Sequence, residues 1–217
     1  NGRRRQRQMC IRDSSKSEGI NKLSLARFFL FGARDVWFVV ALPVFLEASL
    51  GWNFEQVGAF MGTWVIGYGI VQGSAPALRR LWGQTSSPGV AAVQFWSALL
   101  TAIPALIGVA LWRDANVAIA ITAGLAAFGV VFAMNSSIHS YMVLAYTDAE
   151  SVSLNVGFYY MANAAGRLIG TLLSGAVFML GRTESGGMQA CLWTSSLLVL
   201  LAWLSSLRLP APLKTVS

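Results

Sequence analysis

Long apolar stretches separated by short polar connections run along almost the whole chain. Six such stretches can be delimited, at about 23–48, 56–78, 90–112, 116–143, 152–180 and 189–207. Each exceeds the roughly 18 apolar residues that a helix needs to cross a bilayer. The connections are too short to hold a soluble catalytic domain. The pattern predicts an all-α polytopic membrane protein with six transmembrane helices.

The N-terminal end of the chain differs from this apolar region. Residues 1–15 are rich in arginine, and Gln6-Arg-Gln-Met-Cys-Ile-Arg-Asp-Ser14 resembles translated sequencing-adapter sequence. We therefore expect 1–15 to be a non-native or disordered basic segment. Residues 16–22 then form a cytoplasmic linker, 23–208 the six-helix transmembrane half-domain, and 209–217 a cytoplasmic tail.

Composition supports a membrane protein and excludes other classes. Of the 217 residues 55% are hydrophobic and 12% are charged, whereas a soluble domain carries about 25% charged residues. The net charge is +7, but much of it lies in residues 1–15, so we expect no nucleic-acid partner. The two cysteines and the single histidine give no disulfide or metal spacing, and no nucleophile–base pair is evident. We therefore expect no metal, no cofactor and no enzymatic activity.

The basic residues of the short connections predict the orientation. One side receives Lys16, Lys22, Arg79, Arg80, Arg208 and Lys214, and the other side receives Arg113 and Arg182. Because cytoplasmic loops carry the excess of lysine and arginine, both termini are expected in the cytoplasm.

Three charged residues lie deep inside the spans. Arg34 follows Leu23 by 11 residues, which places it ~16 Å into the first span, near the midplane. Arg167 lies at a similar depth in the fifth span. A charge at such a depth costs at least ~2.5–3.5 kcal/mol and indicates a functional site by default. Asp35 points about 100° away from Arg34 on a helix, so it need not pair with its neighbour, and we expect it to pair with another helix.

The charge balance of these spans indicates an anionic ligand. Asp35 is the only clear deep carboxylate, so one acid faces two arginines. Guanidinium forks suit phosphate and carboxylate oxygens. We interpret Arg34 and Arg167 as binding residues for a small anionic substrate, and Asp35 as a coupling or charge-pair residue. A purely structural ion pair is the alternative for Arg34.

Other polar residues in the spans are weaker candidates. Arg27 shares a helix face with Arg34, but it lies close to the cytoplasmic end, where we expect its side chain to snorkel to the interface. The further candidates for substrate binding are Tyr68, Gln72, Asn135 and His139. Each of these types, taken alone, more often makes an interhelical hydrogen bond.

Two further patterns concern the contacts between helices. The stripe Gly166, Gly170 and Ser174 repeats every four residues and predicts the close approach of another helix. A cytoplasmic gate is also predicted, because two connections expected on one side carry opposite charges. Its residues are Arg79, Arg80, Asp148 and Glu150. Exposed pairs are each worth only ~0–1 kcal/mol, so such a gate would shift populations of states more than folding.

Six spans with both ends inside match one half of a major facilitator superfamily transporter, whose halves each contain a 3+3 inverted repeat. Gly73-Ser-Ala-Pro-Ala-Leu-Arg-Arg80 falls where such halves carry a glycine-and-basic loop, although it lacks that motif's aspartate. Ala26–Leu46, Trp64–Gln72 and Ser74–Ala77 resemble the C-terminal half of the ArsJ-type organoarsenical efflux permeases. The resemblance runs from about Leu23 to the end of the chain.

This resemblance implies a specific function. The family exports 1-arseno-3-phosphoglycerate across the bacterial inner membrane, and a glyceraldehyde-3-phosphate-dehydrogenase-like partner makes that ester from arsenate and triose phosphate. The chain would then lack its N-terminal six-helix half. The alternatives are a carrier of another phosphorylated or organic anion, and a six-helix membrane scaffold or assembly subunit without transport.

Overall fold

The chain is a bundle of seven α-helices in the computed structural model, which describes residues 2–84, 86–113, 116–147 and 151–212, with side chains from Glu18 onward. The helices are α1 (Gly2–Phe38), α2 (Ala41–Leu50), α3 (Phe54–Leu81), α4 (Val90–Trp112), α5 (Val117–Ala145), α6 (Val152–Leu180) and α7 (Glu184–Ser206). No strand occurs in these ranges. The predicted all-α class is thus confirmed there. The bounds of α4 and α6 coincide with the predicted stretches, whereas the first stretch is divided between α1 and α2.

The number of membrane-spanning segments differs from the prediction. Among the described residues, five segments are long and apolar enough to cross a membrane, and they are Glu18–Leu50, α4, α5, α6 and α7. Helix α3 has the length, but its glutamines, glycines and terminal arginines lower its hydropathy below that of the others. The predicted count of six is therefore not met by length and composition alone.

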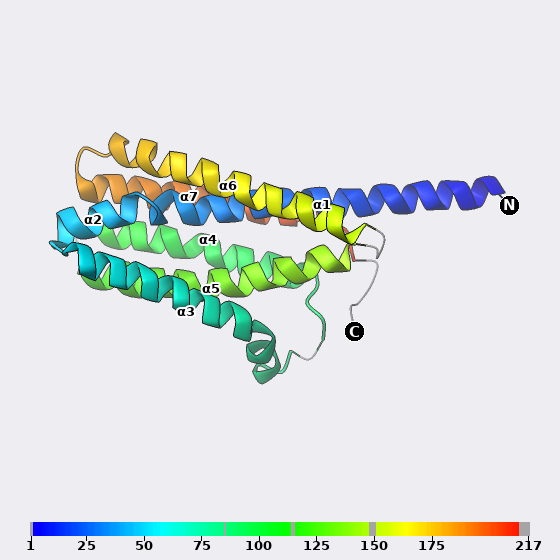
Figure 1. The fold of residues 1–217 in the computed structure, drawn as a ribbon, viewed down its shortest axis with the longest axis horizontal. Helices are drawn as coiled ribbons and strands as arrows, with labels where there is room; N and C mark the ends of the chain where they lie inside the picture. Colours follow the sequence, from blue (N-terminus) through cyan, green and yellow to red (C-terminus); the bar gives the residue numbers. More distant parts are fainter. Residues whose placement is uncertain (1, 85, 114–115, 148–150, 213–217) are drawn as a thin grey trace.

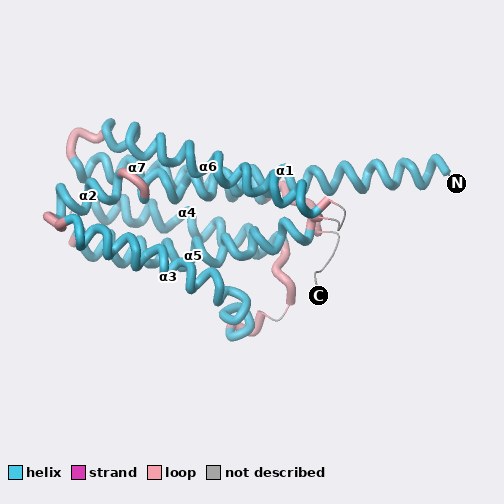
Figure 2. Tube along the Cα trace, in the orientation of Figure 1, coloured by secondary structure: helices cyan, strands magenta, loops and turns pink. Residues whose placement is uncertain are grey.

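The helices form two layers (Figure 1). Helices α3 and α6 lie in front in this view, whereas α4 and α7 lie behind them. Helix α1 packs chiefly against α6 and α7, and α5 packs against α4 and α3. Figure 2 shows that the connections gather at the two ends of the bundle, except for the short break between α1 and α2, which lies within it. The end at which α1 enters the bundle is called the N-terminal end below, and α7 and the α3–α4 connection also reach it.

The basic N-terminal segment is helical. Helix α1 begins at Gly2 and projects beyond the bundle (Figure 1). The expected disorder of residues 1–15 is therefore wrong for the backbone from Gly2 onward. The physical reason is that arginine, glutamine and methionine are good helix formers, and extending an existing helix needs no new nucleus. That this segment can be deleted without effect stays a prediction.

A break between α1 and α2 divides the first span. The proline ring of Pro43 is incompatible with the carbonyl four residues earlier, at Val39, so the helix is interrupted there. The hydroxyl of Ser174 on α6 accepts hydrogen bonds from the freed backbone N–H groups of Val40 (3.3 Å) and Ala41 (3.1 Å). These two hydrogen bonds connect α6 to the break in the first span.

Candidate functional site

The candidate site lies where α1 and α6 touch without intervening side chains. A Cβ atom added to Gly166 would lie 2.1 Å from the carbonyl oxygen of Phe28, and one added to Gly170 would lie 2.5 Å from that of Gly32. Only glycine permits so close an approach of two backbones. The predicted stripe of small residues is confirmed, and it brings Arg167 of α6 beside Asp35 of α1.

Asp35 holds both deep arginines. Its Oδ1 atom accepts a hydrogen bond from Arg34 Nε at 2.6 Å, and its Oδ2 atom accepts one from Arg167 Nε at 3.1 Å. The side chain of Asp35 is 1% exposed, that of Arg34 is 12% exposed and that of Arg167 is 56% exposed. The carboxylate is thus fully buried, and one of its two cations is open to the surroundings.

The arrangement confirms the expected partner of Asp35 and adds a second one. Asp35 does pair with a different helix, as predicted, but it also pairs with its neighbour Arg34. Adjacent helical residues diverge by about 100° at the backbone. The long arginine side chain nevertheless folds back across that angle, because no other carboxylate lies near it within the described spans.

Arg27 forms a second cationic site on α1, two helical turns before Arg34. The residue is 3% exposed, so the expected snorkelling to the interface is wrong. Its Nη1 atom donates hydrogen bonds to the hydroxyl of Ser136 (2.9 Å) and to the backbone carbonyl of the same residue (3.2 Å) on α5. Its guanidinium also lies over the rings of Phe31 (4.0 Å to the centroid) and Tyr159 (4.9 Å). Among the described residues, it has no carboxylate partner.

The ring of Phe31 connects the two sites. The guanidinium carbon of Arg34 lies 5.1 Å from the centroid of this ring, which Arg27 contacts as well. Phe31 in turn packs edge-on against Phe132 of α5, with centroids 5.1 Å apart. The negative face of an aromatic ring attracts cations. The structure therefore places three guanidinium groups in a row between α6 and α5, separated by one carboxylate and one aromatic ring.

The other predicted binding residues divide into two groups. Tyr68 lies near the row, because its hydroxyl is 3.5 Å from that of Ser136, the acceptor of Arg27. Gln72 is partly buried one turn further along α3. Asn135 is completely buried and exchanges hydrogen bonds with Ser97 of α4 at 3.1 and 3.4 Å, which holds it away from the row. Its geometry is that of an interhelical hydrogen bond.

His139 is also completely buried on α5. Neither ring nitrogen has a hydrogen-bond partner among the described residues. It lies one turn beyond Asn135 toward the N-terminal end of the bundle. The side chain is enclosed by the bundle in this structure, so a ligand would reach it only after the helices move apart.

The predicted gate is described only in part. Arg79 donates hydrogen bonds to Gln84 Oε1 (3.1 Å) and to the carbonyl oxygen of Ser86 (3.2 Å), within its own connection. Arg80 is exposed. Asp148 and Glu150, the expected partners of these arginines, lie outside the described residues.

The contact between Arg27 and Ser136 was not predicted, although Ser136 lies in the polar cluster of residues 135–139 that was a weaker candidate. A usable signal existed for Arg27, since Arg27 and Arg34 are seven residues apart and share a helix face. The contact itself could not be found from spacing, because Ser136 meets Arg27 only through the packing of α5 on α1. In the described part of the chain, no three metal-ligating side chains gather.

Comparisons with known proteins add no family. No protein-family model matches the chain, and no curated protein matches it either. The functional argument therefore rests on the residues and their geometry.

Proposed function

We propose that the chain is one six-helix half of a major facilitator superfamily carrier that exports a small organic anion, 1-arseno-3-phosphoglycerate. The bilayer of the bacterial inner membrane is its environment, with both termini in the cytoplasm. A second six-helix half is its structural partner, and a glyceraldehyde-3-phosphate-dehydrogenase-like enzyme supplies the substrate. Arg34 and Arg167 bind the anion, while Asp35 releases one of them when the anion arrives.

The observation that carries this proposal is the exposed position of Arg167. This residue is 56% exposed although it lies 15 residues after Val152 and 13 before Leu180, the ends of an apolar helix. A guanidinium at such a depth needs a partner protein surface or water, because contact with lipid tails is costly. A water-filled path beside α6 meets that need.

The charge of the row indicates an anion as the cargo. The row holds three guanidinium groups, those of Arg27, Arg34 and Arg167, and one carboxylate, that of Asp35. Two positive charges therefore remain unbalanced among these described residues. A doubly anionic ester with oxygens at both ends neutralises this excess. Asp35 engages both Nε and Nη2 of Arg34 but only Nε of Arg167, so the Nη edge of Arg167 is the one left for such a contact.

The packing of the helices supports a 3+3 inverted repeat. Exchanging the unit α1–α4 with the unit α5–α7 maps the α1–α6 contact onto α5–α3 and the α4–α5 contact onto α7–α1. The α4–α7 contact maps onto itself. Repeats of this kind place their substrate sites near the midplane. Arg34 lies there, 16 residues from each end of the segment Glu18–Leu50.

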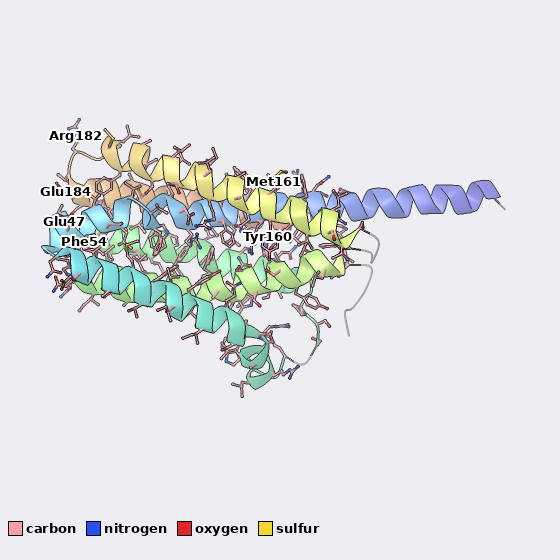
Figure 3. All side chains as sticks on the ribbon, in the orientation of Figure 1. Glu47, Phe54, Tyr160, Met161, Arg182 and Glu184 are labelled. Atoms are coloured by element: carbon pink, nitrogen blue, oxygen red, sulfur yellow. The ribbon has the colours of Figure 1, made fainter. Side chains whose placement is uncertain are left out.

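The proposal is tested by arsenic efflux from cells. Cells without arsenic exporters would receive the full-length carrier and the dehydrogenase-like enzyme, and their retained arsenic would be measured after loading with arsenate. We expect retained arsenic to fall with the wild-type carrier and not with an Arg34→Gln/Arg167→Gln variant. The control is Arg182→Gln, which removes a charge at the end of the bundle away from the N-terminal end (Figure 3).

Either of two results would contradict the proposed arsenical export and favour another function. Unchanged arsenic retention together with increased efflux of a sugar phosphate would indicate a carrier of another phosphorylated anion. No efflux of either kind, at equal protein level and with intact helicity, would favour a membrane scaffold without transport.

A further inference from the structure

A cavity lies at the N-terminal end of the bundle. Its volume is about 360 Å³, and it opens between the end of α3, the α3–α4 connection and α5. Its lining combines polar residues, among them Arg79, Arg80, Ser86 and Ser137, with the apolar Pro76 and Ile138.

The two arginines give this cavity a positive charge. Arg79 is held by two uncharged acceptors, Gln84 Oε1 and the carbonyl oxygen of Ser86, so its charge is oriented but not neutralised. Arg80 is exposed. In the ranges that the structure describes, neither guanidinium forms an ion pair. Adjacent arginines beside serine hydroxyl groups form a site suited to phosphate oxygens.

The surroundings of the cavity indicate a lipid and not a soluble anion. Leu81 and Trp82 follow Arg80 directly and are 80% and 53% exposed. Trp82 is held in place by stacking on Trp96 of α4, with ring centroids 6.0 Å apart. Exposed tryptophan beside arginine at the end of a membrane helix is typical of the headgroup layer. An occupant that carries both a phosphate and an acyl chain can contact the arginines of the cavity and the exposed apolar side chains beside it.

We propose that the Arg79–Arg80 cavity binds the phosphate group of an anionic phospholipid. The phosphodiester lies against the two guanidinium groups, and the acyl chains follow Leu81 and Trp82 into the bilayer. Basic pockets between membrane helices bind lipid headgroups in this way. This site is independent of the proposed transport function, because it lies outside the row of arginines that the transport proposal uses.

The proposal is tested by lipid binding to the full chain in detergent. Native mass spectrometry would count bound short-chain phosphatidylglycerol, with phosphatidylcholine and inorganic phosphate as the comparison arms. Each arginine near an anionic headgroup contributes about a fivefold preference, so Arg79→Gln/Arg80→Gln should weaken phosphatidylglycerol binding about thirtyfold. Arg80→Gln alone should weaken it about fivefold, and it removes no described contact on which folding depends. Phosphatidylcholine should bind equally to all variants.

A matched control separates this site from general surface charge. Arg113→Gln/Arg182→Gln removes the same charge at the opposite end of the bundle and should leave phosphatidylglycerol binding unchanged. An equal loss in this control would overturn the proposal, as would inorganic phosphate that competes fully with the lipid. Asp148→Asn/Glu150→Gln should also leave binding unchanged. A tenfold gain in that variant would show that these acids occupy the arginines, and this too would overturn it.

Discussion

The two arginine sites on α1, Arg34 and Arg27, stabilise their positive charges by different interactions. Arg34 is neutralised by a buried carboxylate that it shares with Arg167, and one member of this triad is exposed. Arg27 is completely enclosed, and it is held by a hydroxyl group, a backbone carbonyl and two aromatic rings. At the first site one cation, Arg167, is open to the surroundings, whereas the second site is enclosed by the bundle.

In the proposed carrier, this difference gives the two sites different parts in transport. A carboxylate that accepts one bond from each of two arginines is a local stand-in for a substrate oxygen. Arg27 keeps its positive charge beside this site without competing for the carboxylate. We infer that the triad receives the anion, and that Arg27 raises the local potential and becomes accessible only when α1, α5 and α6 separate.

The largest expected effect comes from removing the shared carboxylate. Asp35→Asn leaves Arg34 and Arg167 without an acid in mid-span, and breaking a buried pair in this way costs about 3–5 kcal/mol. The melting temperature of the purified protein should fall strongly. The double variant Asp35→Asn/Arg167→Gln should recover part of the loss, because it removes one of the two orphaned charges. Strictly additive losses would show that Asp35 and Arg167 are not coupled.

The next effect concerns the glycine contact that assembles the triad. Gly166→Ala would push its Cβ atom against the backbone of Phe28, and overpacking of this kind costs about 1–3 kcal/mol. Gly175→Ala, in the same helix, is the control, because nothing lies within 4 Å of the added atom. Thermal unfolding of both variants in one detergent measures the difference. Equal melting temperatures would contradict the close approach of α1 and α6.

A smaller effect on stability is expected at the enclosed site. Arg27→Met replaces a buried charge that has no carboxylate partner with an apolar chain of similar length, and such exchanges are often neutral or stabilising. Stability should therefore change by less than about 1 kcal/mol, while arsenic efflux is lost. A strong loss of stability would mean that Arg27 is mainly a structural residue, and intact efflux would remove it from the transport path.

The sequence predicted most of the helices because their cause is local. Apolar stretches of the right length mark α4 and α6 at their observed bounds, and Pro43 accounts for the break after α1. The glycines and polar residues of α3 give it a lower hydropathy than the other spans have, although its length matches the prediction. The high charge of residues 1–15 does not prevent a helix, because arginine and glutamine are good helix formers.

The site was predictable only where one helix decides it. Depth in the span identified Arg34, Asp35 and Arg167, and the small-residue stripe identified the face on which they meet. The enclosure of Arg27 depends on Ser136 and Tyr159, which come from α5 and α6, and no spacing in one helix encodes that meeting. Asn135 was a candidate for substrate binding because it is polar in mid-span, but in the structure it hydrogen-bonds to Ser97 on another helix.

The most direct test of the anion-binding triad is the efflux rate of the Arg167→Lys variant. Lysine keeps the charge but loses the planar fork, so it cannot hold Asp35 and a substrate oxygen in the same geometry. In arsenate-loaded cells with equal protein levels, we predict at least a tenfold lower efflux rate than wild type, and an unchanged rate for the control Arg182→Lys. A wild-type rate in Arg167→Lys would contradict the role of this residue in binding the anion.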